Sequence, residues 1–447
     1  MDRETNYFLH FSVISANLVS FSIGSAYSWT SPVLPKLHDN VTNPLGKATT
    51  TLEDSWITSM LSLGAVLGPF PGALSSEKVG RKTTLLVFTS PMAASHLLCA
   101  FAATVELYVL ARFLLGLGIG CCLAVLPNFV AEIAEDRNRG LSGCVMGVMM
   151  AFGSLYSYVV GPFVSIRLFS VCNLIPVALF YLTFGVFVPE SPYFFVSVGD
   201  VVKARRSLRK YRATMVEKEL FLVVESVEYC KSRRTGGLNT KRGLFIGLGL
   251  MFFQQFSGIC AVLSYMQTIF HAAGDSIPSH VAVIIIATVA MVTTVTTTQL
   301  VDAIGRRLLL IVSTAGCFAS LSVLGLFFRL KSTGSDVDSM WWLPIASVVA
   351  YIVAYNLALG PLPWTITGEL FTSKEKSSGS AMCACACLTL AFAITVSFPT
   401  LSETLGLAWC FWTFGGCCAA ALLFVLFLVP ETGGKSLRDV QELLNAR

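Results

Sequence analysis

The sequence predicts an all-α membrane protein with twelve transmembrane helices in two pseudo-symmetric bundles of six. Of its 447 residues, 54% are hydrophobic and only 13% are Asp, Glu, Lys or Arg, a composition outside the range of soluble globular proteins. Twelve stretches without any of these four charged residues are each long enough to cross about 30 Å of hydrocarbon. They form two sets of six around a polar centre, and charged motifs recur at matching places in both sets.

The predicted spans divide at a polar stretch near the middle of the chain. The charge-free stretches cover residues 5–35, 55–76, 83–105, 113–131, 140–166 and 168–189, followed by 243–274, 276–301, 308–328, 339–368, 377–402 and 404–430. The stretch between the two sets has the pattern of short amphipathic surface helices. We therefore predict an N-terminal bundle (1–189), a cytoplasmic helical linker (190–242), a C-terminal bundle (243–430) and a cytoplasmic tail (431–447).

The positions of the Lys and Arg residues indicate which side of the membrane each loop faces. With a cytoplasmic N-terminus, 25 of the 31 Lys and Arg residues lie in inner loops, tails and the linker. Five lie in outer loops, and Arg112 lies within the fourth span. By the positive-inside rule both termini are predicted to be cytoplasmic, with the plasma membrane as the expected location. The net charge of +5 thus reflects topology, and no basic patch interleaved with aromatic residues predicts nucleic-acid binding.

Enzymatic and metal-binding patterns are not found in the sequence. Most of the 14 cysteines lie inside apolar runs, where we expect free thiols that pack as small residues. Cys383, Cys385 and Cys387 alternate along a predicted helix, so they point to different faces and cannot jointly bind one metal. We expect no catalytic residues, no cofactor and no metal site. Asn40 begins an Asn-Val-Thr glycosylation signal in the first predicted outer loop.

Charged motifs at the predicted inner ends of the spans occur once in each half. The pairs are Glu77-x-x-Gly80-Arg81-Lys82 with Asp302-x-x-Gly305-Arg306-Arg307, Glu132 and Arg139 with Glu369 and Lys376, and Pro189-Glu190 with Pro430-Glu431. The members of these pairs are 225, 237 and 241 residues apart. Such similar spacings indicate an internal duplication. Parallel six-helix halves with a solute site between them are typical of one large class of transporters.

With these motifs in order, the chain resembles the sugar porters of the major facilitator superfamily, and most of all the insect facilitated trehalose and hexose transporters. The resemblance also rests on six further motifs, which are Arg112 to Gly120, PESP at 189, QQFSGI at 254, GPLPW at 360, Glu369-Leu370-Phe371 and PETGGKSL at 430. The resemblance covers essentially the whole chain. It implies facilitative transport of a sugar, trehalose or a hexose, across a cell membrane by alternating access.

Two adjacent amides, Gln254 and Gln255, lie in a run without charged residues between Arg242 and Asp275. Polar residues inside a membrane helix either bind neighbouring helices together or face a water-filled cavity that holds a ligand. A transporter architecture favours the cavity, and the resemblance places substrate contacts at this pair. Amides supply both the donors and the acceptors that sugar hydroxyls require.

The GPLPW segment is a second candidate part of the site. Its two prolines predict a break or bend in the tenth span, which could close over a solute. Trp364, directly after them, offers a flat face to the C–H face of a sugar ring; the alternative is a tryptophan of the interfacial belt.

The charged motifs are expected to form a gating network. Its predicted members are Glu77, Arg81, Glu132, Arg139 and Glu190 in the first half and Asp302, Arg306, Glu369, Lys376 and Glu431 in the second. Ion pairs among them would hold the inner ends of each half together in an outward-facing state and would separate when the halves rock. The alternative is that they serve only as positive-inside anchors.

Four positions depart from the pattern of the family. Where sugar porters carry amides, this chain has Gly147, Cys260, Ala290 and Cys387. A hydrogen bond lost from such a site is worth about 0.5 to 1.5 kcal/mol, so weaker or redirected binding is expected. The site could accept a bulkier sugar such as a disaccharide, or a less polar non-sugar solute, or the chain could be a sensor that no longer transports.

Proton coupling is not expected. Proton-driven relatives pair an acidic residue of span one with the arginine of span four, but the run from Asn6 to Pro35 contains no Asp or Glu. Arg112 therefore has no acidic partner there. His10 is the only group of the run that titrates near neutral pH, and its expected role is interfacial packing. The sequence thus predicts facilitated diffusion.

Overall fold

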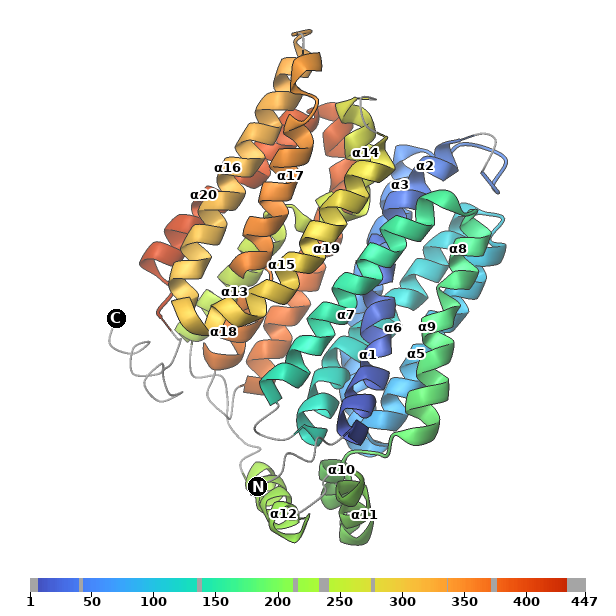
Figure 1. Ribbon diagram of the computed structural model, residues 1–447, viewed down its shortest axis with the longest axis vertical. Coiled ribbons are helices and arrows are strands. Elements are labelled where there is room, and N and C mark those ends of the chain that lie inside the picture. Colours follow the sequence, from blue (N-terminus) through green and yellow to red (C-terminus); the bar gives the residue numbers. More distant parts are fainter. Residues whose placement is uncertain are drawn as a thin grey trace. The chain divides into compact units, whose positions relative to one another are not determined.

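The computed structural model is built from helices that follow the predicted spans (Figure 1). The structure describes residues 7–39, 43–134, 139–211, 216–232, 241–274, 278–335, 337–370 and 376–431. Within these ranges it has 12 helical segments that are long and apolar enough to cross a membrane, and it contains no β-strand there. The predicted fold class is confirmed.

Six of these segments precede the linker, and we number the spans in chain order. Spans one to three are α1 (Tyr7–Ser28) with α2 (Thr30–His38), α3 (Thr51–Leu67) with α4 (Pro69–Lys78), and α5 (Arg81–Phe101). Spans four to six are α6 (Val105–Ile133), α7 (Arg139–Val160) with the short η1 (Gly161–Phe163), and α8 (Ile166–Cys172) with α9 (Leu174–Phe180) and the π-helical turn η2 (Tyr181–Gly185).

The described part of the linker contains three helices, and the last two cover the segments with the predicted amphipathic pattern. They are α10 (Pro192–Ser197), α11 (Val201–Tyr211) and α12 (Val216–Ser232), and Figure 1 shows them grouped beyond the ends of the spans. Their apolar faces pack on one another through Ala204, Leu208 and Val223. Two hydrogen bonds fix α11 to the chain before it, because the Tyr211 hydroxyl donates to the carbonyl oxygen of Pro189 at 2.9 Å and the Ser207 hydroxyl donates to that of Glu190 at 2.6 Å.

In the second six spans, the helices of spans seven and ten are interrupted. Spans seven to nine are α13 (Lys241–Phe256) with α14 (Ile259–Ala273), α15 (Ser279–Ile304) and α16 (Arg306–Ser332), which is followed by η3 (Asp338–Met340). Spans ten to twelve are α17 (Leu343–Ala354) with the π-helical turn η4 (Tyr355–Leu359) and α18 (Leu362–Leu370), then α19 (Lys376–Thr404) and α20 (Leu407–Phe427). The predicted break of span ten is confirmed, because η4 and a turn at the first proline separate α17 from α18.

Packing divides the chain into two compact units. The first comprises Met1–Ala26, Met60–Ser154 and Val164–Thr235, and the second comprises Tyr27–Ser59, Leu155–Phe163 and Gly236–Arg447. This division follows contacts between residues, whereas the boundaries at 189 and 243 follow the repeated motifs. Those boundaries stay predictions.

Glycines allow spans two and four to approach closely in the first unit. A Cβ atom on Gly64 would lie 2.2 Å from the carbonyl oxygen of Phe113, and one on Gly116 would lie 2.1 Å from that of Leu61. Helices without side chains at the crossing can bring their backbones into contact, which is a common way of packing helices in a membrane. A larger residue at either glycine would force these spans apart.

Candidate functional site

The amide pair lies where span seven is broken. Gln254 and Gln255 occupy the last turn of α13, and Gly258 follows with a left-handed backbone, φ +87°. A Cβ atom on Gly258 would lie 2.4 Å from the ring of Phe414, so both the conformation and the space require glycine. The break places the two buried amides, 2% and 7% exposed, beside spans ten and eleven.

Two thiols hold the side chain of Gln255. Its Nε2 donates to Cys387 Sγ at 2.9 Å, and its Oε1 accepts from Cys260 Sγ at 3.0 Å. Cys387 comes from α19, and Cys260 follows the break in α14. Two of the four positions where the family carries amides therefore contact the pair that remains.

Gln254 binds the backbone of span ten. Its Nε2 donates to the carbonyl oxygens of Leu359 at 3.1 Å and Gly360 at 2.6 Å, directly before the first proline of GPLPW. The thiol of Cys387 lies 3.6 Å from its Oε1. The nitrogen of Gln254 is thus committed to a neighbouring helix, and the thiol near its oxygen is a weak donor.

Asn356 is a further candidate for the site, and the sequence did not single it out. It lies in η4, is partly buried, and its Nδ2 donates to the carbonyl oxygen of Ala290 at 3.3 Å. Ala290 is one of the positions where the family carries an amide, so an amide from span ten lies beside that position. The available signal was that Asn356 is the only Asn or Gln in the run 339–368.

The third predicted contact, Trp364, and the departure at Gly147 lie differently. Trp364, in α18, is 46% exposed. Gly147 lies exposed on α7, in the first packing unit. Asn40 falls outside the described residues, so the glycosylation signal stays a prediction.

The first half of the predicted gating network forms a compact cluster, which we call the Gly80 corner. It comprises Gly80 to Thr83, Glu132, Glu190 and Ser191. The Glu190 carboxylate accepts from the backbone N–H groups of Arg81 at 3.1 Å, Lys82 at 2.9 Å and Thr83 at 3.4 Å, and from that of Ser191 at 2.8 Å. A carboxylate at the start of a helix stabilises its free N–H groups.

The Arg81 side chain joins this corner to the end of span four. Its Nη2 lies 3.0 Å from Glu132 Oε1, and its Nε donates to the same oxygen at 3.1 Å. The hydroxyl of Ser191 donates to the other oxygen of Glu132. Glu77 lies exposed in the last turn of α4, and the side chain of Arg139 lies outside the described residues.

The second half repeats the arrangement around Gly305, and we call Gly305 to Arg307 with Glu431 the Gly305 corner. Glu431 accepts from the backbone N–H groups of Arg306 at 3.1 Å and Arg307 at 3.0 Å. Arg307 Nη2 donates to the carbonyl oxygen of Leu426 at 2.5 Å. The side chains of Asp302, Glu369 and Lys376 lie outside the part of the chain that the structure describes.

Within the second packing unit, side chains of spans one and five bind the backbone of α14. The α14 helix is kinked at Tyr265, whose φ of −112° and ψ of 17° are not helical. The hydrogen bonds run from the Thr30 hydroxyl to Ser264 O at 3.3 Å, from the Tyr158 hydroxyl to Leu263 O at 2.9 Å and from Gln267 N to the Ser31 hydroxyl at 3.1 Å. A kink exposes backbone groups that water cannot satisfy in a membrane, so neighbouring side chains bind them.

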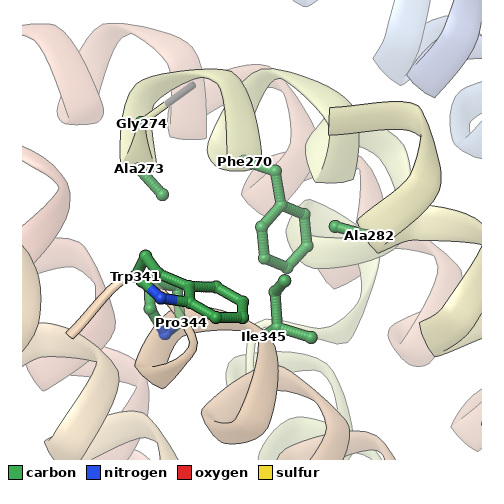
Figure 2. A pocket seen from close by; sticks show the side chains of 7 residues that line it. All are labelled: Phe270, Ala273, Gly274, Ala282, Trp341, Pro344 and Ile345. Atoms are coloured by element: carbon green, nitrogen blue, oxygen red, sulfur yellow. The ribbon is translucent and has the colours of Figure 1, made fainter. Parts of the chain in front are cut away.

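A small hollow lies apart from the amide pair, at the ends of α14 and α15 and before α17. Its volume is about 310 Å³ including its open mouth. It is lined by Phe270, Ala273, Gly274, Ala282, Trp341, Pro344 and Ile345. Figure 2 shows the rings of Trp341 and Phe270 beside the Ile345 side chain. None of the predicted site residues lines it.

Comparison with known proteins gives one consistent result over nearly the full length. A family profile described as "Sugar (and other) transporter" matches residues 13–444. The facilitated trehalose transporter Tret1 of Polypedilum vanderplanki is 33% identical over 448 residues, which cover 98% of this chain and 88% of that protein. The Tret1-2 homolog of Drosophila simulans is 33% identical over 446 residues, covering 98% and 91%.

Solved structures share the fold. The inward open conformation of the xylose transporter XylE from E. coli matches with a TM-score of 0.83 at 22% identity, covering 97% of this chain and 99% of that chain. XylE bound to 6-bromo-6-deoxy-D-glucose matches with a TM-score of 0.77 at 23% identity, covering 98% and 99%.

Proposed function

Because this chain belongs to the sugar transporter family of the major facilitator superfamily, we propose that it carries trehalose or a hexose across the plasma membrane by facilitated diffusion. The observation that carries this proposal is the buried amide pair at the break of span seven, in a chain that matches the family over residues 13–444. Matched donors and acceptors are what sugar hydroxyls require. Trehalose is the solute in the names of the insect relatives.

The proposed sugar contacts come from spans seven and ten. Gln255 contributes both ends of its amide, Gln254 its Oε1, Asn356 its amide, and Trp364 its ring face. The present partners of Gln255 are thiols, which are weak donors and acceptors. A sugar hydroxyl would replace them at little cost, so Cys260 and Cys387 act as partners of the amide when no sugar is bound.

Alternating access would use hydrogen bonds at both ends of the spans. We assign the bonds of Thr30, Ser31 and Tyr158 with α14 to the outer side, where they hold span seven against spans one and five. The Gly80 and Gly305 corners, with the whole predicted charge network, belong to the inner side. This assignment keeps both termini cytoplasmic, as the distribution of Lys and Arg favours, and keeps the bundles at 1–189 and 243–430 with the linker and tail in the cytoplasm.

Uniport is supported by the surroundings of Arg112. Its Nη1 donates to the carbonyl oxygen of Ala26 at 2.8 Å, so span one offers it a backbone group where a proton-driven relative offers an acid. The buried His96 lies within electrostatic reach of Arg112. A proton on His96 would place two cations together in a buried site, which makes it a poor proton carrier.

The direct test is uptake of a panel of radiolabelled sugars, including trehalose and glucose, in cells that lack their own transporters. We expect saturable uptake that a protonophore leaves unchanged, with the solute recovered chemically intact, as a transporter rather than an enzyme requires. A protein that reaches the cell surface and moves none of the sugars would contradict the proposal.

A further inference from the structure

Span ten does not close its own backbone hydrogen bonds where it bends. In the π-helical turn η4, Tyr355 O accepts from Gly360 N at 2.9 Å, five residues on, instead of from Leu359 N, four residues on. The N–H group of Leu359 is therefore shifted away from its regular acceptor, four residues back, and an additional acceptor strengthens its bonding. In a membrane no bulk water can supply one.

Ser313 of span nine supplies it. Its hydroxyl accepts from Leu359 N at 3.0 Å and donates to Ala354 O at 2.6 Å. These two backbone groups are five residues apart, as the partners of one π-helical hydrogen bond are. The hydroxyl of a different span is thus inserted into the ladder of span ten. Ser313 is fully buried, so no solvent competes for these bonds.

Gln254 makes a similar repair one step further along the chain. In a regular helix Leu359 O would accept from the N–H group four residues on, but that residue is Pro363, which has none. The Nε2 of Gln254 donates to Leu359 O and to Gly360 O instead. Spans seven and nine therefore replace, with side chains, the backbone bonds that the π-helical turn and the proline remove.

We propose that Ser313 is a positioning residue, which together with the Nε2 of Gln254 braces span ten and sets its bend at GPLPW during transport. The proposal rests on the proposed function and adds to it a residue that has no contact with the sugar. An unbraced bend would leave buried N–H and C=O groups without partners, which is costly. The hydrogen bonds of Ser313 and Gln254 therefore favour one defined bend over a range of bends. This bend keeps Trp364, in the part of span ten that follows it, at a fixed position relative to the amide pair.

Two substitutions of Ser313 test the brace by uptake into proteoliposomes. Ser313→Ala removes the hydroxyl, and Ser313→Cys keeps a weaker donor and acceptor of similar size. We expect Ser313→Ala to lower the maximal rate about tenfold with KM changed less than about twofold, and Ser313→Cys to fall between it and the wild type. Ser320→Ala is the matched control, because the Ser320 hydroxyl bonds only to Gly316 O of its own helix, at 2.8 Å.

Hydrogen exchange of the purified protein provides a readout that needs no substrate. Peptides covering 354–364 should exchange faster in Ser313→Ala than in Ser320→Ala or the wild type, since the Leu359 amide loses its acceptor. A Ser313→Ala protein with wild-type exchange in this segment, or with a wild-type maximal rate, would overturn the brace. A raised KM at an unchanged maximal rate would also overturn it, since that result marks a binding residue.

The two proposals fail separately. A wild type that transports no sugar, with exchange at 354–364 still raised by Ser313→Ala, overturns the proposed function and supports the brace. A wild type that transports, with Ser313→Ala equally fast and equally protected, overturns the brace alone. If Ser313→Ala does not fold, Ser313→Cys decides the matter by the same exchange measurement, where unchanged protection contradicts the proposal.

Discussion

The Gly80 and Gly305 corners carry the same motif but close it to different degrees. In both, a glycine with positive φ, +102° and +93°, precedes a helix whose first N–H groups bind a distant glutamate. Glu190 accepts from four backbone N–H groups, whereas two backbone bonds reach Glu431 in the described part of the chain. A Cβ atom on Gly80 would lie 2.2 Å from Glu190, but one on Gly305 would lie 3.4 Å from Glu431.

This difference teaches that a duplicated motif need not have duplicated strength. The Gly80 corner fits its carboxylate against the backbone and also ties Arg81 and Ser191 to Glu132. Glu431 of the Gly305 corner lies further from the Cβ position of its glycine. If both corners hold the inner ends of the spans together, the Gly80 corner should contribute more to transport and stability than the Gly305 corner.

The largest effect is expected from the glutamates. Glu190→Gln should lower uptake per surface transporter at least about tenfold, because hydrogen bonds to a charged acceptor are worth about 1.5 to 3 kcal/mol each. Glu431→Gln should lower it about threefold, since this carboxylate fits less closely against its glycine than Glu190 does. Initial rates normalised to surface protein measure both. Glu217→Gln, in the exposed linker pair with Arg205, is the control, and equal losses at the two corners would contradict the ranking.

Substitutions of the two glycines compare how closely each glutamate packs against its glycine, without changing any charge. Gly80 (φ +102°, ψ 161°) and Gly305 (φ +93°, ψ 149°) lie in a region that is essentially restricted to glycine. An alanine there costs about 1 to 3 kcal/mol, and this cost applies to both Gly80→Ala and Gly305→Ala. Gly80→Ala must also displace the Glu190 carboxylate, so it should lower the thermal unfolding temperature in detergent clearly more than Gly305→Ala. Unfolding temperatures that fall equally would show that the closer fit of the Gly80 corner adds nothing.

The Arg81 side chain tests whether geometry or charge holds the first corner. Arg81→Lys keeps the charge but loses the planar fork that reaches Glu132 through Nε and Nη2. We expect uptake to fall about threefold, less than the loss of a whole charge-assisted bond, because the lysine ammonium still reaches Glu132 as a point charge. Wild-type uptake by the lysine variant would mean that the positive charge alone suffices, as in a positive-inside anchor.

The smallest effect should come from the hydroxyl of Ser191. Ser191→Ala removes its bonds to Glu132 and to Tyr193 N, but the Glu132 carboxylate keeps its two contacts with the Arg81 guanidinium. A small decrease in unfolding temperature and less than about a twofold loss of uptake should result. A loss as large as that of Glu190→Gln would show that Glu132, and not Glu190, contributes most to the Gly80 corner.

The sequence was enough to predict the spans and the corners, for a physical reason. A helix in lipid must be apolar over a set length and must place its charges at the ends, so hydropathy and charge alone locate both. The break of span ten was predictable from Pro361 and Pro363, since neither can donate a backbone hydrogen bond.

The partners of the amides could not be predicted in the same way. The bonds of Gln255 with Cys260 and Cys387 depend on which faces of three helices meet, and a single sequence does not specify this. The π-helical turn of span ten has no residue signature, so neither the role of Ser313 nor the place of Asn356 follows from the motifs. The amides thus bind neighbouring helices, which is one of the two roles that the sequence left open, and contact with a sugar is the proposed second role.

The central claim, sugar transport at the amide pair of span seven, is tested most directly by the initial rate of radiolabelled trehalose and glucose uptake into proteoliposomes. Wild-type protein, Gln255→Leu and Asn128→Leu would be compared, because the exposed Asn128 amide donates only to Ala124 O of its own helix, at 3.0 Å. We predict saturable uptake by the wild type and Asn128→Leu, and at least about a tenfold loss in Gln255→Leu. Equal uptake by all three proteins would contradict the assignment of the site.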